Sequence, residues 1–432
     1  SFIDEEFIYE MIEELTARMF AVGGISLPRP FPRMTYDTAM ERYGSDRPDL
    51  RFGMAFEEVT DLLKETQYAV FRQLVQAGGC IKGFCVKGQA DALSKNVLQN
   101  EYAMKIAPSF GARGMTWMKV ANGRLESNIV QFFSDTEQSN LRVRFGAGDG
   151  DVLIMIADTD RDLVNKVLSA LRLHLAERLN LIPEDRFVPL WVTDFPLFEL
   201  KDGKLGSQHH PFTMPDRVDF DPANQQECLA LKSRAYDLVM NGEELGGGSI
   251  RIHRMDIQKK IFLALELTEE ELEAKFGFFL RALEYGAPPH GGLALGLDRV
   301  IAMILKASSI REVIAFPKNR SAFCPLSQAP SFVEDSQLKE LGLAIPSTGF
   351  APERASTAGV KAETAASLSE RVSPDQVKHI AKLARLKLTD SEVLLYQKDL
   401  NSILEYVEAL RDLDAENVRP MSHVIPMKNV WR

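Results

Sequence analysis

The chain has 432 residues, of which 45% are hydrophobic and 26% charged, and its formal net charge is −10. This length suggests two or three domains, and the negative charge argues against a protein held to nucleic acid by electrostatics alone. The sequence shows no signal-peptide pattern and no apolar run of membrane length, and its four cysteines lack metal-ligand spacing, so we expect a cytoplasmic protein with buried thiols and no membrane partner.

Two regions make up the first 185 residues. Residues 1–60 open with an amphipathic helical pattern between Phe7 and Phe20, followed by a proline-rich stretch at 27–33 that must be extended or turn. Residues 61–185 alternate short β-prone runs, at 115–120 and 152–157, with helical stretches, and end in a helix predicted over 163–179. The pattern predicts a compact α+β module.

The histidine pair His209-His210 follows a return to β-prone sequence at 187–192. Adjacent histidines are more often a structural hydrogen-bonding pair than metal ligands, and no cysteine or carboxylate here completes a zinc set. From the residues alone, the structural pair is the favoured interpretation.

A β-hairpin is predicted around Asn241-Gly242, which lies between two β-prone runs. A two-residue loop there pairs Val239 with Glu244. Asp237 then lies on the same face as Glu244, about 7–8 Å away as a diagonal neighbour. Two carboxylates at that separation repel unless a cation lies between them. One interpretation is a Mg²⁺ site that bridges ATP phosphates, and the other is a pair of solvated carboxylates on a strand face.

Three glycines, 246–248, follow Glu244 and permit a close approach of a ligand and a β-bulge. A bulge would be required to turn Arg251 onto the face of Glu244, since strict alternation places it opposite. Arg251 then suits bidentate recognition of a carboxylate, and a surface salt bridge is the alternative.

The run 285–301 combines a glycine-rich strand with the start of a helix. Small side chains there let a flat base or a ribose lie against the backbone, while Arg299 at the helix start can pair with phosphate or stack on adenine. The alternative is a surface helix that begins with an Asp298/Arg299 pair. The small residues of the run are Gly291, Gly292, Ala294 and Gly296.

The composition changes after residue 342. Residues 343–372 are rich in Ala, Ser, Thr and Gly without an apolar period and are predicted to be a flexible linker. Residues 373–432 then show two helix starts, an N-cap at Ser373 and a capping box at Thr389. A helical hairpin would hide the apolar face of the second helix. That face comprises Val393, Tyr396, Leu400, Ile403, Leu404, Val407 and Leu410.

Several of these segments resemble, in the same order, bacterial-type aspartyl-tRNA synthetases of class II. The segments are 42–51, 190–199, 209–213, 236–253, 285–301 and 313–318, and 285–301 resembles motif 3 of that class. The resemblance covers roughly residues 1–340. It implies an α+β fold: a class II antiparallel-sheet catalytic domain in two segments, 1–60 and 186–342, interrupted by a GAD-like insert at 61–185.

The resemblance also implies functions for single residues. It assigns the metal site to Asp237 and Glu244, and the aspartate site to His209 and Arg251. It assigns catalysis to Arg299 and Glu244. The cofactors implied are ATP and Mg²⁺, and the substrates are L-aspartate, tRNA(Asp) and tRNA(Asn). The ATP site would comprise Glu244, Gly296, Leu297, Asp298 and Arg299.

Ser1 matches a position directly after motif 2 of these synthetases. Motifs 1 and 2 and the anticodon-binding barrel are therefore expected to precede it, and the catalytic domain here is expected to be incomplete. On this hypothesis the chain alone does not form aspartyl-adenylate, whereas a full-length parent does, as a homodimer.

The tail, 373–432, resembles the C subunit of the bacterial aspartyl/glutamyl-tRNA amidotransferase, through segments 377–386, 403–407 and 420–430. That resemblance implies the amidotransferase A and B subunits as partners, and a ligase fused to the enzyme that amidates its mischarged product. The alternative is a catalytically inactive truncated paralogue that acts as a binding adaptor for the amidotransferase or for tRNA.

Overall fold

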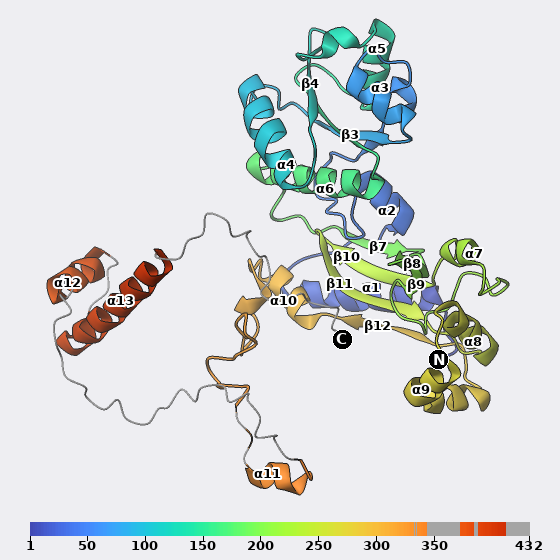
Figure 1. The fold of residues 1–432 in the computed structure, drawn as a ribbon, viewed down its shortest axis with the longest axis vertical. Coiled ribbons are helices and arrows are strands. Elements are labelled where there is room, and N and C mark those ends of the chain that lie inside the picture. Colours follow the sequence, from blue (N-terminus) through green and yellow to red (C-terminus); the bar gives the residue numbers. More distant parts are fainter. Residues whose placement is uncertain (332, 334, 344–371, 384–387, 412–432) are drawn as a thin grey trace. The chain divides into compact units, whose positions relative to one another are not determined.

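The computed structural model describes residues 1–331, 333, 335–343, 372–383 and 388–411. The chain divides into two compact units, Ser1–Phe332 and Val333–Arg432. Unit 1 contains two five-stranded sheets, each with its own helices (Figure 1). This arrangement is the α+β class predicted from the sequence.

The first sheet has the strand order β1-β7-β10-β11-β12. Its pairs are antiparallel except for β1 and β7, which run parallel. The strand β7 corresponds to the β-prone run predicted at 187–192. The strands are β1 (Arg33–Thr35), β7 (Pro189–Thr193), β10 (Ala235–Met240), β11 (Glu243–Ile250) and β12 (Gly291–Leu295).

One face of this sheet is covered by helix α1 (Glu5–Val22), which confirms the predicted amphipathic helix. Ile8, Ile12 and Phe20 of α1 join a core with Trp191 and other residues of the strands. The opposite face carries a smaller apolar cluster near β1 and helix α2 (Tyr36–Tyr43), and is otherwise lined by polar and small residues. Only the first face therefore buries a large continuous core.

The second sheet has the order β2-β3-β6-β4-β5 and is antiparallel throughout. Helix α6 (Arg161–Arg178), predicted at 163–179, packs on one face, and α3 (Ala69–Gln76) and α5 (Asp135–Arg144) pack on the other. Its remaining elements are β2 (Glu57–Glu58), η1 (Thr60–Leu63), β3 (Cys80–Val86), η2 (Val97–Ile106), α4 (Ala107–Ser109), β4 (Thr116–Ala121), β5 (Arg124–Glu126), η3 (Val130–Phe132) and β6 (Val152–Asp158).

The two sheets are joined by close contacts between α2 and α6. Gly44, at the C-terminus of α2, has a φ of 65°, and a Cβ there would lie 2.3 Å from the Asn165 carbonyl oxygen. The buried Lys82 amine on β3 donates to the Glu41 carbonyl at 2.9 Å and to Asn165 Oδ1 at 3.0 Å. A glycine and a hydrogen-bonded lysine thus allow the second sheet and its helices, called the second module below, to pack directly against α2.

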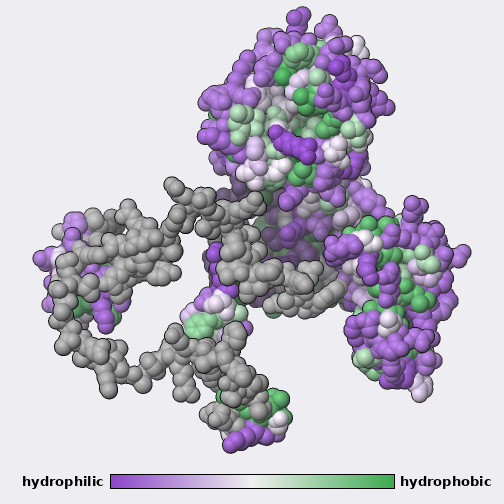
Figure 2. All heavy atoms as spheres, in the orientation of Figure 1, coloured by the Kyte–Doolittle hydropathy of each residue, from purple (hydrophilic) through white to green (hydrophobic). Residues whose placement is uncertain are grey.

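A lobe beside the first sheet contains the two-stranded sheet β8 (Phe198–Lys201) and β9 (Lys204–Ser207). Polar residues dominate the surface in Figure 2, and hydrophobic ones gather over this lobe, where Leu263 and Phe278 are exposed. The other elements of unit 1 are α7 (Gln225–Leu229), α8 (Met255–Ala264), α9 (Glu269–Glu284), α10 (Leu297–Ile304) and η4 (Ile310–Glu312).

Unit 2 contains α11 (Asp335–Glu340), α12 (Pro374–Leu383) and α13 (Asp390–Arg411). Both predicted helix starts are confirmed, because the Gln376 and Glu392 amides donate to Ser373 Oγ and Thr389 Oγ1. The α12–α13 contact does not follow the predicted apolar face throughout. Gln397 of α13 is 7% exposed and donates to the Val372 carbonyl at 3.1 Å, while Tyr396 is 46% exposed. The buried face of α13 thus includes Val393, as predicted, and also Gln397, whose side-chain hydrogen bond helical periodicity does not reveal.

Several sequence-based expectations lie outside the described residues. They are most of the predicted linker at 343–372, the segment 420–430, and the side chains of Ile403, Leu404, Val407 and Leu410. The domain boundaries within each unit stay predictions.

All four cysteines are free and buried, as expected. Of the described helices, none combines the length and the apolar character that a bilayer crossing requires.

Candidate active site

The predicted hairpin is present, with β10 and β11 joined at Asn241-Gly242. Both turn residues have positive φ, 55° and 88°, as a tight two-residue turn requires. The predicted pairing of Val239 with Glu244 is confirmed. Asn241 also ties the turn to the chain before β7, since it accepts from the Val188 amide at 3.0 Å.

A β-bulge follows at Leu245. The register shifts there, because Val239 pairs with Glu244 but Leu238 pairs with Gly246. The sequence predicted the bulge among the glycines, and the structure places it directly before them. Its consequence is the predicted one: the alternation is reset, so Arg251 shares the face that carries Asp237 and Glu244.

The two carboxylates of that face meet over Gly247, which pairs with Asp237 across the hairpin. A Cβ at Gly247 would lie 2.5 Å from Asp237 Oδ1 and 3.3 Å from Glu244 Oε1. Both oxygens therefore lie near a single point above the backbone. A side chain at residue 247 would displace at least the Asp237 carboxylate.

Burial and neighbouring negative charge act together on Asp237. Desolvation, followed by the charges of Glu244 and Asp46, raises the pKa of Asp237 to about 8. Asp46, in the loop after α2, was not among the predicted site residues. Its only signal in the sequence was its place in the segment 42–51 that resembles the synthetases.

The carboxylate pair fits a divalent cation only if a ligand supplies further oxygens. Among the described residues there is no group of three His, Cys, Asp or Glu side chains placed to hold a metal ion. Mg²⁺, however, is commonly held by one or two carboxylates together with water and substrate phosphates. Asp237 and Glu244 meet that requirement, since both carboxylates reach one point above Gly247.

The predicted glycine-rich strand and helix start are β12 and α10, and Gly296 is the N-cap of α10. Gly292 has nothing within 4 Å of the position of a Cβ, so the strand surface is open at that point. Arg299 donates to the Glu244 carbonyl at 2.7 Å, and its Nη1 lies 3.9 Å from Glu244 Oε2. This contact sets the guanidinium beside the carboxylate pair, next to the open surface of β12.

Arg251 lies at the other end of this face, beside a cavity of about 350 Å³ lined by β11 and β12. Its Nη1 is 3.0 Å from His210 Nδ1. Burial, and then the charge of Arg251, lowers the pKa of His210 to about 4, so its imidazole is neutral near pH 7 and can accept a hydrogen bond from Arg251.

His209, which the resemblance assigned to aspartate binding, lies within electrostatic range of Glu244 and Asp46. Its exposed ring packs edge-on against Phe195 at a centroid distance of 4.6 Å. His210 is thus the histidine that contacts Arg251. The assignment of His209 to aspartate binding stays a prediction, and the contact of His210 with Arg251 was not foreseen because neighbouring residues of a loop have no fixed side-chain direction.

The fold and this polar sheet face agree with the comparison to known families. Residues 1–320 match the family described as tRNA synthetases class II (D, K and N). The chain belongs to this family. Residues 388–432 of the synthetase chain match a second family, the Glu-tRNAGln amidotransferase C subunit.

Curated relatives of this class II chain include ligases of similar sequence. Aspartate–tRNA(Asp/Asn) ligase 1 of Syntrophus aciditrophicus is 56% identical over 431 residues, which are 99% of this chain and 57% of that protein. The Aspartate–tRNA(Asp/Asn) ligase of Persephonella marina is 47% identical over 354 residues, 80% of this chain and 58% of that protein. The chain thus spans somewhat more than half the length of these relatives.

We predict that Asp237→Asn stabilises the chain at alkaline pH in the absence of divalent cations. Because the pKa of Asp237 is about 8 in the folded state, the folded chain holds a proton that the unfolded chain has lost above its usual pKa of 3.8. This stability is present below about pH 4 and is lost as the pH rises toward 8. The variant should therefore melt higher than wild type at pH 8.5, on a scale of about 2–4 °C per kcal/mol.

Thermal unfolding of both proteins in EDTA would measure this effect. It should be recorded at about pH 5 and about pH 8.5, because most of the pH-dependent loss of stability falls between these values. A difference between the two proteins that does not grow with pH would contradict the proposed ionisation of Asp237.

A second prediction concerns Gly247. Gly247→Ala should destabilise the fold by about 1–3 kcal/mol, because its methyl group would overlap Asp237 Oδ1. Gly292→Ala on the neighbouring strand is the matched control, since its methyl group meets open space. Denaturant unfolding of both variants is the measurement, and equal losses would contradict the crowding above Gly247.

Proposed function

We propose that this chain carries part of an aspartate–tRNA ligase that uses ATP and Mg²⁺ to activate L-aspartate and transfers it to tRNA(Asp) and tRNA(Asn). The observation that carries the proposal is the polar face of the first sheet, on which a crowded carboxylate pair lies between Arg299 and Arg251. The names of the relatives support aspartate and both tRNAs. Their identity to this chain does not favour the inactive adaptor.

The nucleotide end of the site would comprise Glu244, Gly296, Leu297, Asp298 and Arg299. Glu244 and Asp237 would hold Mg²⁺, which neutralises phosphate charge when bound. Arg299 is anchored on the Glu244 carbonyl at 2.7 Å, so its guanidinium is placed for phosphate without rearrangement of the backbone. The open backbone of β12 would accept the base or the ribose.

The amino-acid end would be built on Arg251. Its planar guanidinium can bind the side-chain carboxylate of aspartate through two hydrogen bonds. The neutral His210 ring orients Arg251 without competing for that negative charge. His209 remains a candidate for a contact from the exposed side of the site. An aspartate α-carboxylate oxygen would then attack the α-phosphate of ATP and release pyrophosphate.

Other parts of the proposal concern assembly. The sheet β2-β3-β6-β4-β5 with α6 supports a GAD-like insert at 61–185, although its edge strand β2 lies just before residue 61. The match to the amidotransferase family supports a fusion in which 373–432, beyond a linker, joins amidotransferase A and B subunits. A tether of that kind raises the local concentration of the two enzymes to about the millimolar range. We further propose a homodimer and a cytoplasmic location.

We predict separate effects for the two arginines in the full-length ligase of which we propose this chain is a part, here called the full gene product. Arg299→Ala should raise the KM for ATP at least about tenfold, the scale expected when a hydrogen bond to a charged group is lost. Arg251→Lys should instead raise the KM for aspartate, because lysine cannot form the two-pronged contact. Aspartate-dependent ATP–pyrophosphate exchange, with each substrate varied in turn, gives both constants.

The two variants serve as controls for each other. Equal increases in both constants for both variants would refute the division of the site into two ends. Absence of exchange in the wild-type gene product would refute the proposed ligase function itself.

A further prediction concerns the tail. The chain should capture a purified amidotransferase A/B pair that lacks its own C subunit. The double variant Leu394→Asp, Leu395→Asp should lose capture, since both side chains are exposed on α13 and can change without unfolding it. Leu263→Asp, exposed on α8 in unit 1, is the control. Capture that survives the α13 changes but not the α8 change would rule out this surface.

A further inference from the structure

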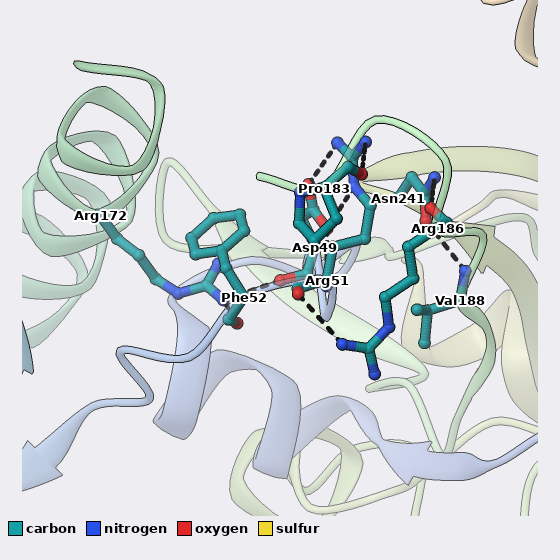
Figure 3. Close-up of polar contacts among 8 residues, drawn as sticks. All are labelled: Asp49, Arg51, Phe52, Arg172, Pro183, Arg186, Val188 and Asn241. Atoms are coloured by element: carbon teal, nitrogen blue, oxygen red, sulfur yellow. Dashed lines mark hydrogen bonds and ion pairs between the residues drawn. The ribbon is translucent and has the colours of Figure 1, made fainter. Parts of the chain in front are cut away.

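Arg172 of α6 extends from the second module into the loop that follows α2 (Figure 3). It is 5% exposed, and its guanidinium donates to the carbonyl oxygens of Asp49 at 2.7 Å, Phe52 at 2.9 Å and Gly53 at 3.0 Å. The guanidinium also lies 4.0 Å from the centre of the Phe52 ring. A buried charge is costly unless its donors are satisfied, and three carbonyls of one loop satisfy them here.

Contacts within the loop and with the segment before β7 hold the same loop from a second side. The Asp49 carboxylate accepts from Arg51 Nη2 at 2.7 Å and from the Arg51 amide at 2.9 Å. The Arg51 carbonyl in turn accepts from Arg186 Nη1 at 3.4 Å. The loop 49–53 is therefore held between α6 and the segment that leads into β7.

This loop contacts the tip of the β10–β11 hairpin. A Cβ at Gly242 would lie 3.4 Å from Asp49 Cβ, so the turn lies beside the Asp49 side chain with room for little more than a methyl group between them. Asn241 donates to the Arg186 carbonyl at 2.9 Å, which ties the turn to the same segment (Figure 3). Glu244 lies only two residues beyond Gly242.

Apolar contacts hold the loop as well, since Leu50 packs against a cluster of the first sheet and Phe52 against the cluster that includes α6. A cavity of about 540 Å³ lies between α6 and the turn, lined by Arg172, Asn241 and Gly242 among others. Arg172 contacts neither carboxylate of the site.

We infer that Arg172 is a positioning residue: through loop 49–53 and the Asn241-Gly242 turn, it sets the placement of Glu244 and so couples the second module to the nucleotide end of the site. This inference rests on the proposed function. Arg251 lies at the far end of β11, so the aspartate end should depend much less on Arg172.

The test uses the full gene product and the variants Arg172→Met and Arg172→Lys. Arg178→Met is the matched control, because Arg178 lies on the same helix in an exposed pair with Glu101. Calorimetric titration with MgATP should show a dissociation constant raised about tenfold in Arg172→Met and less in Arg172→Lys. The KM for aspartate in pyrophosphate exchange should change less than twofold, and Arg178→Met should match wild type.

The outcomes separate this inference from the proposed function. Equal weakening of MgATP and aspartate would show a merely structural role and overturn the inference, as would unchanged MgATP binding in both Arg172 variants. If Arg172→Met does not fold, Arg172→Lys, which keeps the charge but not the three carbonyl contacts, decides alone. A wild-type protein that binds no MgATP would overturn the proposed function and this inference together.

Discussion

The crowding of two carboxylates above Gly247 is the constraint on which the site depends. Asp237 and Glu244 come from different strands, and both reach the space that a side chain at residue 247 would fill. Burial and repulsion keep Asp237 protonated up to a pH of about 8. Below that pH the Asp237 carboxyl is neutral, so a cation held by both carboxylates together with phosphate oxygens would bind with release of the Asp237 proton.

The bulge at Leu245 makes the crowded pair part of a longer site. Without the extra residue, Arg251 would project into the opposite face, which packs against α1. With it, one sheet face carries the carboxylates, Arg299 and Arg251 in a row. A single irregularity of register thus separates the face of the candidate site from a core face on the same strand.

Two buried, positively charged side chains hold the second module against this sheet. Lys82 and Arg172 both bind backbone carbonyls rather than carboxylates. Such contacts are directional and depend on the path of the accepting loop, so they specify an orientation more sharply than apolar packing around a cavity would. The loop after α2 is where this orientation meets the hairpin that carries Glu244.

By itself the sequence determined the local features: the Asn241-Gly242 turn, the helix start at Gly296 and the caps at Ser373 and Thr389. Each depends on the backbone preference or hydrogen bonding of residues next to one another. Only the tertiary structure decided the position of the bulge, the approach of Asp46 to Asp237, and the contact of His210 with Arg251. These depend on contacts between segments distant in the chain, which no local pattern specifies.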